Sequence, residues 1–458
     1  MLRNHLTASI RKFLRHPVYT LINITGLILG LTCSIFIFLW VDDELSYNQY
    51  HEENDRVFKV LENQFSSDGS IFTADWNSGA LALALKSEFP EVAQAGRLTW
   101  SDTRLFTAGE KAHYEDGRYA DGSILKILNL SLAEGHLDNP LPDMGAIAIS
   151  KKMAGRYFGR NNALGRNLRM NNGDDVTITA VFEDLPENST EKFDFILPLD
   201  RYLREEGIDP YQWENQGWLK TYVRLKDPQQ RAAVDRKIRG LATKHNPEYR
   251  ADLFLFPFTD WRLYADFENG KPAGGRISYV ISFSLVAAFI LIIACINFMN
   301  LSTARAATRA KEVGVRKAAG ASRSALIQQF MAESVLLAFL ALVASLILVH
   351  LFLPAFNGFT RKNLTIDFFD PAISGTLFSI TLITGILAGS YPAFFLSAFR
   401  PATVLKGHTH TGLKGASLRK TLVVFQFSLS MIIIVCPGWS TSRSPICETK
   451  TSALTRRT

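Results

Sequence analysis

The chain has 458 residues, of which 47% are hydrophobic and only 20% are charged. Its mean hydropathy of +0.05 is too high for an ordinary soluble enzyme of this length. The net charge of +7 is divided unevenly, because residues 42–276 carry 29 basic and 38 acidic side chains, which leaves 21 basic and 5 acidic ones elsewhere. An acidic segment with basic residues beside apolar runs argues against DNA or RNA binding and for a membrane protein.

Four uncharged runs, 19–41, 277–304, 334–360 and 371–399, are long enough to cross a bilayer, which takes roughly 20 apolar residues. Run 19–41 is longer than the apolar core of a secretory signal, about 7 to 15 residues, so we predict an uncleaved first span. The predicted segments are a cytoplasmic N-terminus (1–18), a first span (19–41), an extracytoplasmic domain (42–276), a second span (277–300), a cytoplasmic loop (301–325), a third span (326–354), an outer loop (355–371), a fourth span (372–398), a cytoplasmic linker (399–417), the start of a fifth span (418–435) and a disordered tail (436–458).

Basic residues near the spans set the orientation, because Lys and Arg are enriched on the cytoplasmic side. The first 16 residues include four basic and no acidic side chains, whereas the first span is followed by Asp42, Asp43 and Glu44. We therefore predict a multi-pass membrane protein with its N-terminus in the cytoplasm. None of the four cysteines lies in residues 42–276, so the outer domain is expected to be stable without disulfide bonds.

The outer domain is predicted to be a mixed α/β fold. Alternating or β-branched apolar residues predict strands over 56–63 and 176–182. Helical patterns cover 77–89, with Asn77 as its cap, and also 151–158 and 231–244. Breaks at 139–142 and 184–189 indicate two subdomains.

The same domain lacks the sequence patterns of catalysis. Its histidines are scattered, and HExxH, GxSxG and clustered Cys/His ligands are all missing from the sequence. Glu333 is the one carboxylate inside a predicted span, and its position near the cytoplasmic end predicts contact with water. We therefore expect no catalytic residue, cofactor or metal ion, and an enzyme is the least favoured function.

Loop 301–325 is the most informative stretch. It is rich in Ala, Arg and Lys, which favours a helix, and Glu312 and Arg316 are spaced for an i,i+4 ion pair. One interpretation is a basic helix held on anionic lipid, and the other is a docking element for a cytoplasmic partner. The candidate coupling residues are Arg309, Glu312, Gly314, Arg316, Lys317 and Gly320. In the docking interpretation, Arg316 and Lys317 donate hydrogen bonds to acidic groups of the partner, and the glycines allow close approach or turning.

Residues 312–321, EVGVRKAAGA, resemble the signature that follows the second span in FtsX-like permeases, the membrane subunits of MacB-like ABC transporters. Further segments resemble the branch that has a MacB-like periplasmic core domain: 43–60, 158–168, 182–197, 388–396 and 401–407. The resemblance implies a polytopic helical protein of the bacterial inner membrane with an α/β domain between its first two spans. It also implies a homodimer or a pair with a sister permease, a separate ATP-binding subunit and, in some members, a periplasmic adaptor.

The family plan continues into a second half, and residues 418–435 resemble the opening of that repeat. The last 23 residues have no such resemblance, so we expect a chain truncated after its first half. No GxxxxGK[ST] pattern occurs in the sequence, which predicts that ATP is bound by another subunit. The leading hypothesis is an ABC-transporter permease that couples ATP hydrolysis mechanically to the outer domain, for export or lipoprotein release. The alternatives are a membrane-anchored sensor without transport activity and a non-functional gene fragment.

Overall fold

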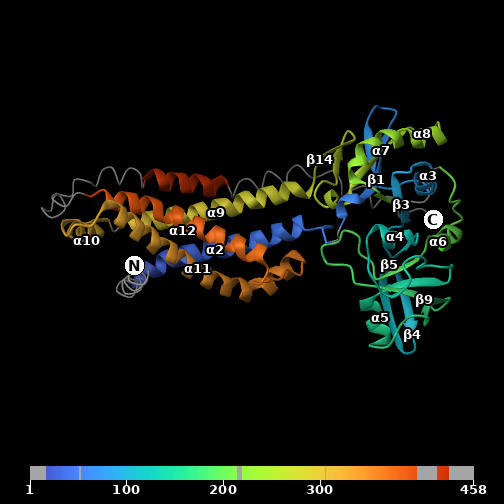
Figure 1. Ribbon diagram of the computed structural model, residues 1–458, viewed down its shortest axis with the longest axis horizontal. Coiled ribbons are helices and arrows are strands. Elements are labelled where there is room, and N and C mark those ends of the chain that lie inside the picture. The colour runs from blue at the N-terminus through green and yellow to red at the C-terminus, as the bar shows by residue number, and fades with distance from the viewer. Residues whose placement is uncertain (1–16, 51–52, 214–218, 305, 400–419, 433–458) are drawn as a thin grey trace. The chain divides into compact units, whose positions relative to one another are not determined.

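The computed structural model describes residues 17–50, 53–213, 219–304, 306–399 and 420–432 (Figure 1). The chain divides into two compact units, one formed by residues 1–42 with 281–458 and the other by residues 43–280. The first unit is helical, and the second is a mixed α/β domain. The predicted tail, and all of the predicted linker after residue 399, lie outside the described residues.

Four helices within the described residues are long and apolar enough to cross a membrane. They are α2 (Pro17–Leu45), α9 (Arg276–Ala304), α11 (Arg323–Thr360) and α12 (Pro371–Ser397). A short helix, α10 (Ala306–Ala318), lies between α9 and α11 in the chain. At the predicted fifth span, the structure has an apolar helix over Lys420–Ile432, which is shorter than the four others.

Helix α11 is longer than the predicted third span. The sequence prediction placed the end of the span at Pro354, but the helix continues through this proline to Thr360. A proline removes one backbone hydrogen bond, and an apolar helix can continue past that loss. Arg361 ends the helix in the left-handed conformation with φ of 53°. The loop predicted to begin at residue 355 therefore begins at residue 361.

Close helix contacts hold the helical unit together. Its central core is made by side chains of all four long helices: Leu27, Leu31, Ala294, Cys295, Phe298, Leu337, Ala341 and Ala388. Helix α12 approaches α11 through two glycines. A Cβ atom on Gly385 would lie 2.8 Å from Cα of Val335, and one on Gly389 would lie 2.6 Å from Cβ of Ser334. Only residues without a side chain permit this approach.

Glu333 in α11 differs from its sequence prediction. We expected water to reach this carboxylate, but only 5% of the residue is exposed. It precedes Ser334, which packs against Gly389 of α12. Its spacing places it on the same side of α11 as Phe330 and Leu337, which belong to buried clusters shared with other helices.

The α/β domain is built on a 12-stranded sheet with the order β10-β7-β9-β8-β4-β5-β3-β11-β1-β12, with β2 paired to β1 and β6 to β9. The strands are β1 (Val57–Phe65), β2 (Ile71–Ala74), β3 (Val92–Leu98), β4 (Asp102–Ala108), β5 (Lys111–Ala120), β6 (Leu132–Gly135), β7 (Ala146–Ser150), β8 (Asn167–Met170), β9 (Asp175–Phe182), β10 (Phe195–Pro198), β11 (Lys220–Leu225) and β12 (Ala251–Pro257), with a separate hairpin of β13 (Asp266–Glu268) and β14 (Lys271–Gly274). The helices are α3 (Leu81–Glu88), α4 (Ser123–Ile127), α5 (Lys151–Phe158), α6 (Leu199–Glu205), α7 (Arg231–Ile238) and α8 (Leu241–His245).

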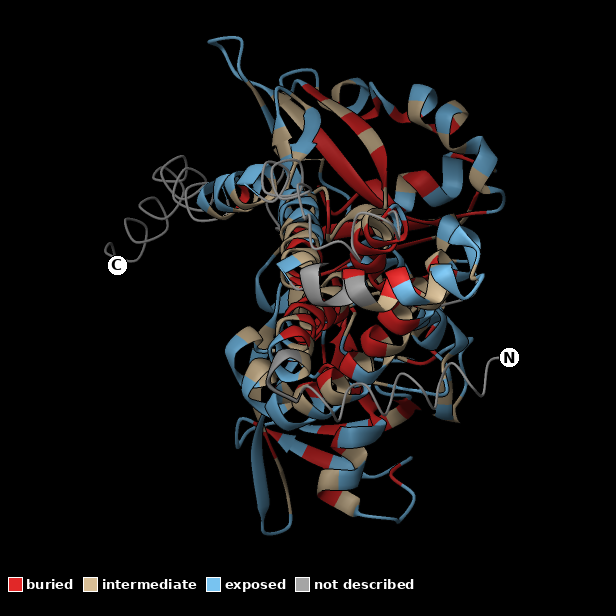
Figure 2. Ribbon diagram, turned by 90° about the vertical axis from the view of Figure 1, so that its left-hand side faces the viewer, coloured by how far each residue is buried: buried red, intermediate tan, exposed pale blue. Residues whose placement is uncertain are grey.

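Two lobes share this sheet, and buried residues line its strands (Figure 2). The core of the first lobe is formed by residues from 58–95 and 223–255, and that of the second lobe by residues from 106–219. The second lobe is thus inserted into the first. We predicted subdomain breaks at 139–142 and 184–189, but both fall inside the second lobe. Polar, proline-containing loops within a lobe give the same local signal as a boundary between lobes.

Local patterns predicted five segments of this domain, with two errors. Helix α5 has the predicted bounds, and β1 and β9 lie within a few residues of their predictions. The predicted helix over 231–244 is divided at Gly240 into α7 and α8. Asn77 does not cap α3, because the helix begins at Leu81 with Ala80 at the cap position. The backbone N–H of Asn77 instead donates to the carbonyl of Leu219 at 2.6 Å.

Candidate functional site

Helix α10 contains most of the residues predicted to couple the chain to a partner. Arg309, Glu312, Gly314, Arg316 and Lys317 lie in the helix, and Gly320 follows it. The side chain of Arg309 lies outside the described part of the chain. The described side chains of α10 divide into those that pack against α11 and α12 and those that are exposed.

The inward side of α10 packs against α11 and α12. Ala310 and Val313 are 2% and 1% exposed. Their cluster is completed by Leu326, Phe330, Ala393, Leu396 and Phe399. A short helix is only marginally stable alone, so this packing is what holds α10 in place.

Arg316 links α10 to α11. Its guanidinium lies 2.7 Å from the carboxylate of Glu312, one turn earlier, and donates to Oε1 of Gln329 in α11 at 2.5 Å. The i,i+4 pair is the one that the sequence predicted. Its second partner, Gln329, was not predicted, because the contact depends on how the two helices pack.

Lys317 links α10 to the end of α12. Its ammonium group donates to the carbonyl oxygens of Ser397 at 2.7 Å and Phe399 at 2.9 Å. The last carbonyls of a helix have no partner within the helix and carry partial negative charge, so a cation is favourable there. Lys317 therefore acts as a cap supplied from another helix.

Gly320 makes the turn between α10 and α11. Its φ of +94° lies in the left-handed region, where a side chain is unfavourable. The backbone N–H of Ala321 donates to the carbonyl of Arg316 at 3.0 Å, which closes the end of α10. Ser322 then caps α11 by accepting from the N–H of Ala325 at 3.2 Å. The two helices are joined without a flexible linker.

Among the described side chains of α10 and the turn after it, small and apolar ones are the most exposed. Val315 is 60% exposed, and Ala318 and Ala319 are exposed as well. We expected Arg316 and Lys317 to offer their charges to a partner, but the structure gives both an internal partner. Val315 is therefore the large apolar residue that the described part of α10 exposes, and the sequence argument did not select it.

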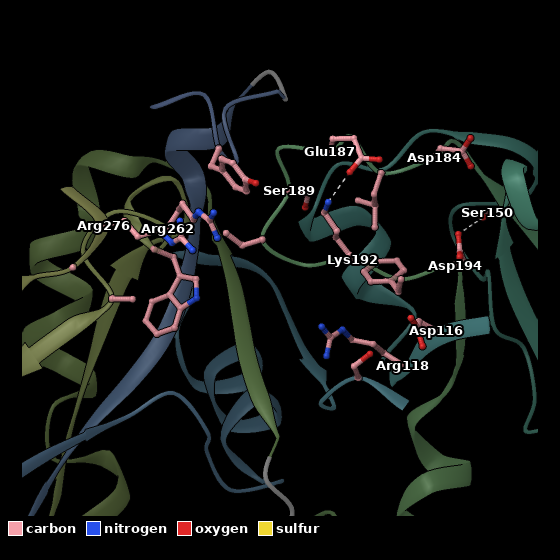
Figure 3. Close-up of a pocket in the computed structure, with 18 of the residues that line it drawn as sticks. Asp116, Arg118, Ser150, Asp184, Glu187, Ser189, Lys192, Asp194, Arg262 and Arg276 are labelled. Carbon is pink, nitrogen blue, oxygen red and sulfur yellow. Dashed lines mark hydrogen bonds and ion pairs between the residues drawn. The ribbon is translucent and has the colours of Figure 1, made fainter. Parts of the chain in front are cut away.

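A second candidate site is a polar cavity of about 980 Å³ in the α/β domain (Figure 3). Basic and acidic side chains line it in equal number: Arg118, Lys152, Lys192, Arg262, Arg276, Asp116, Asp184, Glu187, Asp194 and Asp266. No three His, Cys, Asp or Glu residues in the described part of the chain are grouped to hold a metal ion. The cavity therefore offers balanced charge and no metal-binding cluster among these residues.

A buried ion cluster borders this cavity. Glu191 is 2% exposed and lies 2.9 Å from Arg118 and 3.1 Å from Lys220, and it accepts a 2.6 Å hydrogen bond from Tyr222. Burial opposes ionisation of Glu191, but Lys220, Arg118 and Lys59 outweigh it and lower its pKa to about 2. Glu191 is thus a charged anchor inside the domain. No local pattern marks it, because Lys220 and Tyr222 are 29 and 31 residues away in the chain.

Two family models match the chain, one for each part of this architecture. The MacB-like periplasmic core domain matches residues 20–241, and the FtsX-like permease C-terminal domain matches residues 284–400. The chain thus contains an FtsX-like permease domain that follows a MacB-like periplasmic core domain. The candidate coupling residues and their partners in α11 and α12 all lie within the second match, and the ion cluster lies within the first. The resemblance inferred from residues 312–321 is thereby confirmed.

The permease matches parts of larger curated proteins. The macrolide export ATP-binding/permease protein MacB of Burkholderia lata is 26% identical over 183 residues, which are 40% of this chain and 25% of that protein. The pyoverdine export ATP-binding/permease protein PvdT of Pseudomonas syringae pv. syringae is 30% identical over 120 residues, which are 26% of this chain and 18% of that protein. The matched part therefore spans a quarter or less of these relatives.

One solved structure is similar to part of the chain. A domain of a protein described as a permease from Porphyromonas gingivalis is 25% identical, covers 45% of this chain and 90% of its own, and superposes with a TM-score of 0.40.

Proposed function

We propose that this permease is the membrane subunit of an ABC transporter and that α10 docks on an ATP-binding subunit carried by a separate chain. The observation that supports this most strongly is the attachment of α10 to two membrane helices, through Arg316 to α11 and Lys317 to α12. A push on the outward side of α10 would move the ends of both helices together. The work is mechanical, of the export or lipoprotein-release type.

The proposed topology follows the charges. The N-terminus and residues 301–325 lie in the cytoplasm, and residues 42–276 lie outside the inner membrane, where a periplasmic adaptor could reach them. The basic residues beside the spans support this orientation. The permease acts as a homodimer or with a sister permease.

The exposed side chain of Val315 in α10 defines the test. Val315→Glu places a charge on the proposed contact without removing an internal partner. Ser324→Glu, at an exposed position at the start of α11, adds the same charge outside that contact. The full chain is purified from its native host in mild detergent, and the ATP-binding protein that accompanies it is identified by mass spectrometry.

We expect the parent chain and Ser324→Glu to retain the ATP-binding protein, and Val315→Glu to lose at least 90% of it. Equal recovery with all three chains would disprove docking through α10. Absence of an ATP-binding protein from the parent preparation would favour the sensor hypothesis instead.

A further inference from the structure

Two sequence segments that the proposed function does not use meet in the structure. One is 43–50, which follows the first membrane helix, and the other is the loop 183–194 between β9 and β10. Asn48 lies where they meet. It is 1% exposed and has a φ of 58°, in the left-handed region that an asparagine adopts more readily than most residues.

Every polar group of the Asn48 side chain has a partner. Its Oδ1 accepts hydrogen bonds from the backbone N–H of Thr190 at 2.9 Å and from the hydroxyl of Thr190 at 3.1 Å. Its Nδ2 donates to the carbonyl of Phe258, just after β12, at 2.8 Å. Its backbone N–H donates to the carbonyl of Asn188 at 2.9 Å. Asn48 thus joins the chain after α2 both to loop 183–194 and to the first lobe.

Loop 183–194 makes further hydrogen bonds with residues 43–50. Nδ2 of Asn188 donates to the carbonyl and hydroxyl oxygens of Ser46 at 3.0 and 3.1 Å. The hydroxyl of Tyr50 donates to that of Ser189 at 2.8 Å, and Ser189 in turn donates to the carbonyl of Glu191 at 2.7 Å. Because Glu191 is fixed by Arg118 of β5, the loop is anchored in the sheet at its other end.

Glu44 fastens the same region to the start of α9. This carboxylate, in the last turn of α2, is fully buried. It accepts two hydrogen bonds from Arg262, at 3.0 and 3.1 Å, and a third from Arg276, the first residue of α9, at 3.0 Å. The ends of two membrane helices are therefore tied together beside Asn48, in a geometry that a bidentate arginine makes rigid.

We infer that Asn48 is a positioning residue: it is the centre of a rigid joint, formed by residues 44–50, loop 183–194, Arg262 and Arg276, that holds the second lobe to the last turn of α2 and the first turn of α9. The inference rests on the proposed function in one respect, since a permease that transmits force to its outer domain needs such a joint. A flexible connection at this place would absorb the movement of α2. The charges of Glu44 and Glu191 hold the two ends of the joint, and Asn48 connects them.

The test measures the stiffness of the joint directly and needs no ATP-binding partner. In the full chain with its cysteines replaced by serine, Tyr279→Cys at the start of α9 and Leu164→Cys in the second lobe carry spin labels, since both positions are exposed. Asn48→Gly removes the side chain but keeps the left-handed backbone accessible. Asn172→Gly is the matched control, because Asn172 also has a positive φ, 57°, and its side chain is exposed.

We expect pulsed electron paramagnetic resonance in lipid nanodiscs to give a narrow distance distribution for the parent and for Asn172→Gly. Asn48→Gly should at least double its width. Asn188→Ala removes only the hydrogen bonds to Ser46, so it should broaden the distance distribution less than Asn48→Gly does. If Asn48→Gly does not insert into the membrane, the width for Asn188→Ala tests the joint instead. Widths equal to the parent in both variants would overturn the joint and leave docking through α10 untouched.

Discussion

Replacing Gly389 with alanine tests whether α12 must approach α11 as closely as the structure shows. The added Cβ atom would lie 2.6 Å from Cβ and 2.8 Å from Oγ of Ser334. Non-bonded carbon atoms stay about 3.5–4.0 Å apart, so the helices have to separate by roughly 1 Å or Ser334 has to move. Ser334 is only 6% exposed and already donates to the carbonyl of Phe330 at 3.1 Å, so it has little room.

The expected cost follows from this overlap. Inserting a methyl group into a closely packed site costs about 1–3 kcal/mol, a factor of about 5–160 in the ratio of folded to unfolded protein. Gly375 in the same helix is the control, because a Cβ atom there would meet nothing within 4 Å. Alanine at Gly375 should be neutral or stabilise the helix by up to about 1 kcal/mol.

The assay is thermal denaturation of the full chain in detergent, followed by size-exclusion chromatography of a fluorescent fusion. Gly389→Ala should lose its monodisperse peak at a temperature about 2–10 °C below Gly375→Ala. It should also loosen α10, because Lys317 binds the carbonyl of Ser397 at the end of the displaced helix. Equal melting of the two variants would refute the claim that glycine is required for this contact.

Three further predictions concern the ion cluster, the cap of α12 and the topology. The pKa of Glu191 is about 2 in the folded domain against an ordinary 4.5, so its contribution to stability is complete above pH 4.5 and is lost as the pH falls toward 2. Glu191→Gln should cost about 3–5 kcal/mol at pH 7 and flatten the pH dependence of the urea midpoint over that range; an unchanged profile would contradict the assignment. Lys317→Met keeps the aliphatic stem but loses both carbonyl contacts. Because this loosens α10 and the turn after it, trypsin should cut at the exposed Arg323 several-fold faster than in the parent. An equal rate of cleavage would mean that the cap is dispensable. Cysteines at Ser67 and Ser322 in a chain without its native cysteines should react with an impermeant maleimide in whole cells only at the first position, and labelling at the second alone would reverse the proposed orientation.

Hydropathy located the membrane helices because lipid imposes its requirement on each helix separately. The predictions for 19–41, 277–300 and 372–398 fall within α2, α9 and within one residue of α12. The bounds of α5 could also be predicted from local sequence. Its cap, Ser150, directly precedes the helix and accepts a hydrogen bond from the N–H of Met153. Features that depend only on neighbouring residues, such as apolar length and an N-terminal cap, can therefore be predicted from the sequence.

Contacts between residues far apart in the chain could not be predicted from local sequence patterns. Lys317 binds a carbonyl 80 residues away, and Asn48 binds Thr190 at a separation of 142 residues. A basic residue beside a span and an asparagine after a helix each have many ordinary explanations, so composition cannot choose among them. The candidate helix could be predicted from the sequence, but which of its side chains face outward could not.

The insertion of one lobe into the other has a consequence for biosynthesis. Strand β1 pairs with β11, and Phe58 faces Val223, 165 residues later in the chain. Synthesis adds about 5–20 residues per second, so β11 is made roughly 8–33 s after β1. The strands of the second lobe, within 102–219, are all made during that interval. We expect the second lobe to fold first and the first lobe to close last, by long-range pairing that is intrinsically slow. A variant delayed in that closure would be lost to proteases even when its finished fold is as stable as the parent's.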